Sequence, residues 1–512
     1  MTRFTLIGLM LACTSAVTQA AQYFVSNTGS DTAAGTSAAP WQTLQHAAET
    51  VGPGDRVTAR AGNYTGFYLD TSGTAAAPIE FLAEPGTIIN QRNATTPDGI
   101  NLELASYVVI DGFSVTGMPR AGVRSVGLAN NFASHVTVRN VTATNNGKWG
   151  IFTGHVNDLL IESNSTSGSI DEHGIYVSNS GDRPIIRNNV SFNNRSNGIH
   201  MNGDLSQGGD GIISNAIVAG NRIYNNGVGG GSGINMDGVK NSLIENNLLY
   251  GNHASGISLY KIDGASGSTG NVVVNNTIYE ASDARWAINI QNASTGNTVM
   301  NNILVSAHSF RGAITATSDS LPGLVSDYNA VMDRFSTDDG NTRITLAQWR
   351  AATGQDTHSV IVTPSSVLFA NLAGNDYHLQ SGSPAKNAGT SQFAPPADIE
   401  GLPRKAGAAY DIGAYEFGAL AGDYNRDGSV TAADYVLWRK TVGTSITRFA
   451  GADGDGSGKI DQPDFLRWRS GFAAVAAAGT EFGTEIPEPS SVVFMTVVAA
   501  IAPLALLRVQ LR

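Results

Sequence analysis

The sequence has few of the residues on which several common kinds of protein depend. Its 512 residues include one cysteine, Cys13, and 14% charged residues, with a formal net charge of −11. One cysteine cannot form a disulfide framework within the chain. The acidic balance argues against nucleic acid or an anionic membrane surface as a partner, because phosphate groups attract basic patches. Calcium is the cofactor that such a chain favours.

Helical periodicity is also missing from the middle of the chain, where glycine and asparagine interrupt short runs. The sequence contains 59 glycines. Segments such as NVVVNNTIY are rich in β-branched residues, and in none of them do the apolar residues have helical spacing. This pattern favours a turn-rich β protein. The length allows two or three domains, with ample apolar content for a core.

The N-terminus predicts a secretory signal peptide over residues 1–20. It has one Arg, an apolar run from Phe4 to Cys13 and small residues before a cut after Ala20. The protein is therefore expected to be exported. Because Cys13 lies inside the signal, the mature chain would have no thiol chemistry. The letters LAC leave a lipoprotein signal as the alternative.

The C-terminus has an apolar run, residues 491–507, which is long enough to cross a membrane and is followed by Arg508 and Arg512. Because Pro487, Glu488 and Pro489 precede it, residues 487–512 resemble the PEP-CTERM sorting signal of Gram-negative bacteria. The resemblance implies a removable address, a sorting enzyme, a transient membrane anchor and an extracellular or outer-surface location, with residues 473–486 as a linker. An ordinary C-terminal anchor is the alternative.

The middle of the chain repeats itself. Seven segments share one apolar position, at successive spacings of 24, 24, 35, 23, 31 and 26 residues: Ile151, Ile175, Ile199, Ile234, Ile257, Ile288 and Ile314. An asparagine ladder runs in step with it: Asn140, Asn164, Asn189, Asn221, Asn247, Asn276 and Asn302. A period of about 20 to 50 residues indicates a repeat architecture.

Each repeat holds two or three short strands, so it predicts one turn of a β coil. The predicted fold class is all-β, a right-handed parallel β-helix over residues 22–417, because the leucine pattern of the alternative solenoid is missing. Asparagine amides can bond from coil to coil at a spacing of roughly 4.8 Å. A glycine column, Gly150, Gly174, Gly198, Gly233 and Gly256, is interpreted as a second bend.

The flanks of the repeats resemble known β-helix proteins. Residues 23–66 are similar to the opening of secreted β-helix carbohydrate-active proteins, in which a short helix, here about Thr43 to Val51, caps the first coil. The segments SGSPAKNAG and DIEGLPRKAGAAYDIGAYEF resemble the closing segment of bacterial surface β-helix proteins. One such architecture serves several activities.

Strand alternation predicts two outward columns on these coils if the isoleucines point inward. The first column is Arg124, Phe152, Tyr176, His200, Asn235, Ser258, Asn289 and Thr315, and the second includes Ser178, Asn202, Asp237, Tyr260 and Gln291. Asp204 and Lys261 lie at the turn that adjoins the second column. Insertions around 203–213 and 262–270 are expected to wall a cleft. Since apolar contacts lie on the other side of the strand, Asp237→Asn is predicted to cost little stability.

Three classes of function fit this face. A polysaccharide lyase would use Lys261, Tyr260 or His200 as a base, Arg124, Tyr176, Asn202 and Asn235 to bind a uronate polymer, and calcium shared by Asp204 and Asp237. A C5-epimerase needs nearly the same parts. A glycoside hydrolase needs two carboxylates at a set separation, and no Asp pair here resembles the motif of β-helix polygalacturonases. A non-catalytic glycan-binding protein is the third class, with Phe152, Tyr176 and Tyr260 as platforms.

These residues resemble calcium-dependent pectate-type lyases, which have Asp ligands on successive coils and a Lys base. The resemblance implies calcium at Asp204 and Asp237 and a base at Lys261. The carboxylates are fewer here than in that family's cluster. His173, at a bend, is expected to hydrogen-bond the backbone.

Two acidic loops predict a separate calcium module over residues 420–472. DYNRDGSVTAAD and DGDGSGKIDQPD place oxygen ligands at loop positions 1, 3, 5, 7, 9 and 12. The ligands are Asp423, Asn425, Asp427, Ser429 and Asp434, then Asp453, Asp455, Ser457, Asp461 and Asp464, with Thr431 and Lys459 at the remaining positions. The loops, each followed by an apolar helix, resemble a dockerin type I module. The resemblance implies a cohesin-like partner; a calcium-stabilised spacer is the alternative.

Overall fold

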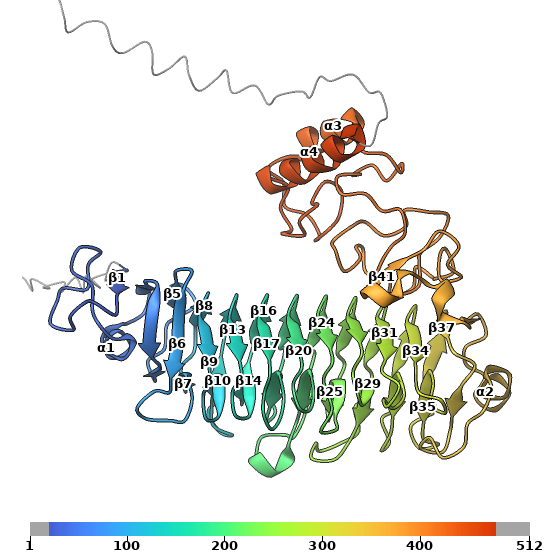
Figure 1. Cartoon of the computed structure of the whole chain (residues 1–512), viewed down its shortest axis with the longest axis horizontal. Coiled ribbons are helices and arrows are strands. Elements are labelled where there is room, and N and C mark those ends of the chain that lie inside the picture. The colour runs from blue at the N-terminus through green and yellow to red at the C-terminus, as the bar shows by residue number, and fades with distance from the viewer. Residues whose placement is uncertain (1–19, 478–512) are drawn as a thin grey trace, which may run out of the picture.

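The computed structural model describes residues 20–477 (Figure 1). The predicted signal peptide, up to residue 19, and the predicted sorting signal lie outside these residues. Among residues 20–477, no helix is both long and apolar enough to cross a membrane. Figure 1 shows stacked coils forming an elongated body, with the helices α3 and α4 beside it.

Three parallel sheets form the walls of the coils. From Arg56 to Ser336 each coil contributes one strand to each sheet in the order A, B, C, while one further strand precedes these in sheet A and one follows in sheet B. Sheet A contains β1 (Gln22–Val25), β2 (Arg56–Ala59), β5 (Ile79–Ala83), β8 (Val108–Asp111), β12 (Val136–Arg139), β16 (Leu160–Glu162), β19 (Ile185–Arg187), β23 (Ile217–Ala219), β27 (Leu243–Glu245), β30 (Val272–Val274), β33 (Thr298–Met300) and β36 (Val325–Asp327).

Sheet B contains β3 (Gly62–Thr65), β6 (Thr87–Gln91), β9 (Ser114–Thr116), β13 (Thr142–Thr144), β17 (Ser165–Ser167), β20 (Val190–Phe192), β24 (Arg222–Tyr224), β28 (Leu248–Tyr250), β31 (Thr277–Glu280), β34 (Ile303–Ser306), β37 (Ala330–Val331) and β39 (Val360–Ile361). Sheet C contains β4 (Phe67–Leu69), β7 (Ile100–Glu103), β10 (Ala121–Val126), β14 (Trp149–Gly154), β18 (Ile175–Ser178), β21 (Ile199–Asn202), β25 (Ser232–Asp237), β29 (Ser255–Tyr260), β32 (Ile288–Ile290), β35 (Ile314–Ala316) and β38 (Phe335–Ser336).

Short elements complete the described chain. Three strand pairs are β11 (Ala133–Ser134) with β15 (Val156–Asn157), β22 (Ile213–Ser214) with β26 (Val239–Lys240), and the antiparallel β40 (Phe369–Asn371) with β41 (Asp376–Leu379). The helices are α1 (Leu44–Thr50), α2 (Leu346–Thr353), α3 (Ala432–Thr441) and α4 (Gln462–Ala477), with short 3-10 turns at Leu205–Gln207, Ser365–Val367 and Leu372–Gly374.

The predicted isoleucine column is confirmed. Ile151, Ile175, Ile199, Ile234, Ile257, Ile288 and Ile314 pair in this order along sheet C, and all are fully buried. The glycine column lies beside it at the starts of the strands. Gly174 and Gly198 lie in bends just before their strands, as predicted, whereas Gly150, Gly233 and Gly256 lie inside theirs. A Cβ on Gly150 would lie 2.7 Å from the carbonyl oxygen of Gly174, and one on Gly233 would lie 2.7 Å from the Leu249 side chain. Glycine is needed there for space.

The asparagine ladder runs along the A–B corner from Asn164 to Asn329. At each step a backbone N–H and a side-chain amide of one Asn donate to the Oδ1 of the next, as between Asn189 and Asn221 at 2.9 and 3.0 Å. Asn140 is out of step, since Val141 occupies the ladder position and its N–H donates to Asn164. Asn329 was missed by the sequence pattern. The ladder satisfies buried backbone donors and keeps the coils in register.

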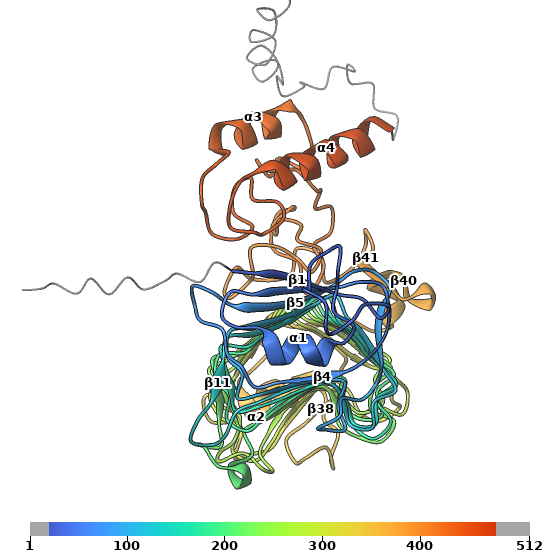
Figure 2. The same cartoon turned by 90° about the vertical axis from the view of Figure 1, so that its left-hand side faces the viewer.

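Two helices cover the ends of the coil stack. α1, with Thr43 as its N-cap, buries Leu44, Ala47 and Ala48 against the first coils, as the sequence predicts (Figure 2). α2 covers the last coils, where Trp349 stacks on Phe335. Both helices hide sheet edges that would otherwise be open.

The closing segment, residues 364–417, lies against the side of sheet B. Phe369, Tyr377 and Tyr415 pack in one apolar cluster with Leu248 and Ile303. Backbone carbonyls of the segment accept bonds from amides at the A–B corner, including Asn246 and Asn275. The segment therefore buttresses the middle of the β-helix.

Candidate functional site

The first outward column of sheet C has the predicted register. Arg124, Phe152, Tyr176, His200, Asn235, Ser258, Asn289 and Thr315 are successive partners in adjacent strands. In the second column Ser178, Asn202, Asp237 and Tyr260 are partners in the same way. The two columns therefore form one continuous polar and aromatic layer, in which His200, Asn202, Asn235, Ser258 and Thr315 are buried.

A groove of about 750 Å³ lies over the N-terminal half of this face. Its lining residues are Glu103, Arg124, Val126, Gly127, Leu128, Ala129, Asn130, Phe152, His155, Asn179 and Gln207. Gln207 comes from the first predicted insertion, which therefore does wall the groove. The two insertions also bond to each other, because Ala265 N–H donates to the Gly211 carbonyl at 2.9 Å and Leu205 N–H donates to that of Asp263 at 2.9 Å.

Arg124 is anchored on the groove floor. Its Nη1 donates to the carboxylate of Glu103 at 2.8 Å and to the side-chain oxygen of Asn101 at 2.8 Å. Its guanidinium carbon lies 6.0 Å from the ring centre of Phe152. A fixed, half-buried guanidinium beside an aromatic ring suits a sugar that bears a carboxylate.

A run of rings continues from the groove along the first column. Trp149 stacks on Phe152 with centroids 4.4 Å apart, Phe152 meets the edge of Tyr176 at 5.4 Å, and Tyr176 stacks on His200 at 4.7 Å. Tyr176 and His200 are nearly parallel, at 8°. The aromatic surface is therefore larger than Phe152, Tyr176 and Tyr260 alone.

Asparagines hold the two tyrosines of the face. Asn235 Nδ2 donates to the Tyr260 hydroxyl at 2.7 Å, and Asn202 Nδ2 donates to the Tyr176 hydroxyl at 3.2 Å. Burial raises the pKa of both tyrosines. Each phenol is therefore protonated at neutral pH, with its oxygen occupied as an acceptor and its proton free to donate. We name Tyr176, His200, Asn202, Asn235 and Tyr260 the central cluster.

Three predicted residues have other partners. Lys261 is exposed, and its Nζ donates to the Ala265 carbonyl in its own loop at 3.3 Å. Asp204 accepts from the N–H of Ser206 at 3.1 Å and from its hydroxyl. Asp237 is buried, and its carboxylate accepts from the N–H groups of Ile262, Asp263 and Gly264 at 2.9, 2.9 and 3.0 Å. These bonds give Asp204 and Asp237 loop-forming roles and do not favour the predicted shared calcium ion.

The bonds of Asp237 also correct the prediction that Asp237→Asn costs little stability. An amide has one acceptor oxygen, so at least one of the three buried N–H groups would lose its partner. We expect a loss of about 1 to 3 kcal/mol in the free energy of unfolding. Chemical denaturation measures it, with the exposed Asp171→Asn as control. A loss for Asp237→Asn no larger than the control's would contradict this role.

Glu103 and His155 were not predicted from the sequence, and His173 was predicted only to bond the backbone. Glu103 is two residues beyond Asn101, the partner of Arg124, so extending the columns by one coil would have found it. His155 follows β14 and lines the groove, and burial lowers its pKa. No spacing signal distinguishes His155, because it lies in an irregular corner.

His173 contacts the central cluster as well as the backbone. Its Nδ1 accepts from the N–H of Asn197 at 3.2 Å, which agrees with the predicted backbone bond. Its Nε2 lies 3.1 Å from Nδ1 of His200. His173 therefore connects the backbone before β21 to the first outward column.

The acidic module has two equivalent loops, each followed by a helix, as predicted. In the first loop the N–H groups of Asn425 and Thr431 donate to Asp434; in the second those of Asp455 and Asp461 donate to Asp464. Each helix also bonds the opposite loop, because Trp438 Nε1 donates to the Asp461 carbonyl at 2.8 Å and Trp468 Nε1 to that of Thr431 at 2.9 Å. The module has an internal two-fold pattern.

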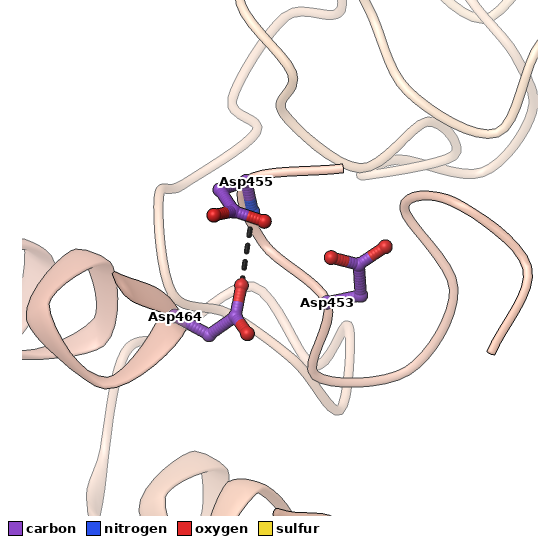
Figure 3. A group of neighbouring side chains, drawn as sticks. All are labelled: Asp453, Asp455 and Asp464. Carbon is purple, nitrogen blue, oxygen red and sulfur yellow. Dashed lines mark hydrogen bonds between the residues drawn. The ribbon is translucent and has the colours of Figure 1, made fainter. Parts of the chain in front are cut away.

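The second loop brings three carboxylates together, as Figure 3 shows for Asp453, Asp455 and Asp464. One oxygen from each lies within 4.8 Å of the others, which makes this the one group of three potential metal ligands among residues 20–477. Burial raises the pKa of Asp464, with the Asp455 charge adding to the effect. Hard oxygen ligands that repel one another when empty fit a calcium ion.

Comparisons with known proteins concern the coils. Residues 23–180 match the family model described as "Pel9A-like, right handed beta helix region", and residues 169–323 match "Right handed beta helix region". The coil is right-handed. The right-handed parallel β-helix predicted from the sequence is therefore confirmed, while neither match reaches the acidic module. No curated protein matches the chain significantly.

Several solved structures resemble this β-helix at low identity. Pectate lyase Pel9A is 18% identical, with a TM-score of 0.49, and the match covers 79% of this chain and 98% of that one. A rhamnogalacturonan lyase is 16% identical, covering 56% and 82%, with a TM-score of 0.44. The A-module of mannuronan C-5 epimerase AlgE6 from Azotobacter vinelandii is 16% identical, covering 62% and 93%, with a TM-score of 0.42. At this level the similarity concerns the fold alone.

Proposed function

We propose that the protein binds an acidic polysaccharide along sheet C and cleaves it by β-elimination at a uronate. The observation that supports this most is the groove with Arg124 on its floor, which leads along one column into the central cluster. An extended polymer on stacked strands meets side chains at a regular spacing of roughly 4.8 Å. The polymer therefore lies along the axis of the coils.

The groove and the central cluster bind different sugars in this proposal. Arg124 and Tyr260 are five strand steps apart along sheet C, which is roughly 24 Å at about 4.8 Å a step. Arg124 therefore holds a uronate several units away from the scissile bond, with Phe152 against the sugar ring. Such a remote contact contributes to binding of substrate and transition state alike.

The reaction takes place at the central cluster. A base removes the proton next to the uronate carboxylate, donors stabilise the resulting enolate-like charge, and an acid protonates the leaving oxygen. Tyr260 suits the acid, since its hydroxyl accepts from Asn235 and keeps a proton to donate. Lys261, at the adjoining rim, is the candidate base. Asn235 keeps one amide N–H beyond its bond to Tyr260 and supplies a donor, whereas both amide N–H groups of Asn202 are taken by Tyr176 and Asp263.

The test of this function is absorbance near 235 nm, where unsaturated uronate products absorb, with a panel of uronate polymers. New reducing ends without this absorbance would point to a hydrolase. Exchange of the C5 hydrogen with solvent deuterium without cleavage would point to an epimerase. Binding without any of these would identify a glycan-binding protein, and failure to bind every polymer would refute the proposal.

Arg124→Gln is expected to raise KM by about ten- to a hundredfold with little change in kcat. The reason is that it removes a charged contact made equally in the substrate complex and in the transition state. Steady-state kinetics on a cleaved polymer measures the two constants. The control is Arg183→Gln, whose exposed ion pair with Asp158 lies outside sheet C. A fall in kcat with KM unchanged would place Arg124 at the reacting sugar instead.

We also propose that residues 420–472 bind calcium through the ten predicted ligands, as a dockerin-like module. The equivalent bonding of the two loops and the three converging carboxylates support this. The cohesin-like partner stays a prediction, with a calcium-stabilised spacer as the alternative. Export and cell-surface location likewise rest on the sequence alone.

Chelation of calcium is expected to lower the melting temperature of this module and leave that of the β-helix unchanged, because the empty loops hold repelling carboxylates. Calorimetry with and without chelator resolves the two transitions. Asp464→Asn should weaken the response, while the exposed Glu49→Gln should preserve it. A module transition that chelator does not move would contradict calcium binding.

A further inference from the structure

A line of hydrogen bonds leads from the backbone just before the start of β21, a strand of sheet C, to the central cluster. The N–H of Asn197 donates to Nδ1 of His173 at 3.2 Å, and the Asn197 side-chain amide lies 3.2 Å from the same nitrogen. Nε2 of His173 lies 3.1 Å from Nδ1 of His200. Both histidines are buried.

The direction of these bonds fixes the proton positions on both rings. A backbone N–H can only donate, so Nδ1 of His173 has a lone pair and a neutral His173 has its proton on Nε2. That Nε2–H donates to Nδ1 of His200. Nδ1 of His200 is then an acceptor, and the proton of the neutral His200 ring is on Nε2.

The surroundings favour the neutral form of both rings. Burial lowers the pKa of His173 to about 3, with the Lys148 charge in the same direction, and burial lowers the pKa of His200 well below its ordinary value. Glu172 is the nearest carboxylate, 3.7 Å from Nε2 of His173. Its two oxygens accept from Lys148 Nζ at 3.0 Å and from Trp149 Nε1 at 2.8 Å, and these bonds hold the carboxylate away from His173.

Nε2 of His200 is buried and makes no hydrogen bond to any of residues 20–477. A buried donor without a partner is costly, and such groups in native proteins commonly have a functional reason. His200 lies between Tyr176 and Asn235 in the first column, within the central cluster. The ring therefore belongs to the cluster where the reacting sugar is proposed to bind, and its Nε2 is covered in this structure.

We propose that His173 is a positioning residue that holds His200 as a neutral Nε2–H donor, and that this donor binds the carboxylate of the reacting uronate. The proposal rests on the proposed function and changes one assignment: a ring with its proton on Nε2 has no lone pair there, so His200 is not the base. A neutral donor in a site with little water stabilises charge as it develops on the carboxylate. No proton changes place in this role.

Nuclear magnetic resonance of histidine-labelled protein tests the proton positions directly. We expect long-range ¹⁵N–¹H spectra to show Nε2–H on both His173 and His200, with no titration between pH 5 and 8. The His173 signal is assigned by its loss in the His173 variants below, and the His200 signal by its loss in His200→Gln. A proton on Nδ1 of His200, or titration of His200 near pH 6.5, would overturn the proposal.

Two substitutions of His173 separate positioning from packing. In His173→Gln the side-chain oxygen can accept from Asn197 and the amide can donate to His200, whereas His173→Leu can do neither. We expect His173→Leu to lower kcat about tenfold or more and to let the His200 proton distribute over both ring nitrogens, and His173→Gln to restore most of the activity. The control is His253→Gln, which changes a histidine at the corresponding corner of another coil, where its ring contacts Asp283. Full kcat in His173→Leu would overturn the proposal.

Ligand binding keeps this proposal separable from the proposed function. A uronate trisaccharide should shift the Nε2 proton signal of His200 in the parent protein, and a neutral trisaccharide should not. Absence of cleavage on every polymer would refute the lyase reaction only. A trisaccharide that binds without shifting the His200 signal would overturn the donor role, whether or not the protein is an enzyme.

Discussion

Arg404→Met is expected to lower the free energy of unfolding by about 3 to 5 kcal/mol, because it leaves buried carboxylates without their counter-charge. Arg404 is fully buried and pairs with Glu416 at 3.3 Å. Its Nη2 also donates to Asn246 Oδ1 at 2.6 Å and to two carbonyls of the closing segment. The one guanidinium thus ties residues 364–417 to the A–B corner of the coils.

The surrounding acids make this loss severe. Burial raises the pKa of Glu416, Asp398 and Asp411, while the charge of Arg404 acts in the opposite direction on each. Without Arg404 these groups must take up protons or admit water. The closing segment should therefore detach before the coils unfold.

Chemical denaturation together with limited proteolysis measures the effect of Arg404→Met. New cleavage is expected within residues 364–417. The control is Arg56→Met, which removes an exposed ion pair with Glu80 and should cost no more than about 1 kcal/mol. If both variants lose the same small amount, the buried pair is not what holds the segment.

The coils could be predicted from the sequence because one residue type repeats at one structural position. Ile199 and Ile234 are 35 residues apart, yet alignment by their neighbours gives the correct strand register. The ladder was misplaced at Asn140 because two adjacent positions at the corner both favour asparagine. Asn140 has a positive φ of 53°, and the next position, Val141, faces the ladder.

The partners of the site residues could not be predicted in the same way. Column membership fixes which residues share a face, but it does not show that Asp237 bonds the 262–264 loop or that Lys261 bonds its own loop. Those contacts depend on how irregular insertions fold back. His173 lies in such a corner, so its contact with His200 needs three-dimensional coordinates.

Glu280→Gln is expected to stabilise the β-helix, and the gain should grow with pH. Glu280 ends β31, is fully buried, and neither of its carboxyl oxygens makes a hydrogen bond to residues 20–477. Burial raises its pKa well above the ordinary value, with Asn252 as the polar neighbour that opposes the shift. The folded protein therefore keeps a proton on Glu280 that the unfolded chain releases above its ordinary pKa of 4.5.

The sign of the pH dependence follows from this proton. Between the unfolded and the folded pKa of Glu280 the folded state binds one more proton, so this group makes stability fall as pH rises, by up to about 1.4 kcal/mol per pH unit. Its contribution is complete below the unfolded pKa and is lost as pH approaches the folded one.

Glutamine has the same shape and no proton to lose, and its amide can bond Asn252. The difference in unfolding free energy between variant and parent should therefore be small at pH 4.5 and increase with pH until the folded pKa of Glu280 is reached. Denaturation at several pH values measures it, with the exposed Glu49→Gln as control; a difference that stays constant with pH would show that Glu280 is ionised in the folded protein.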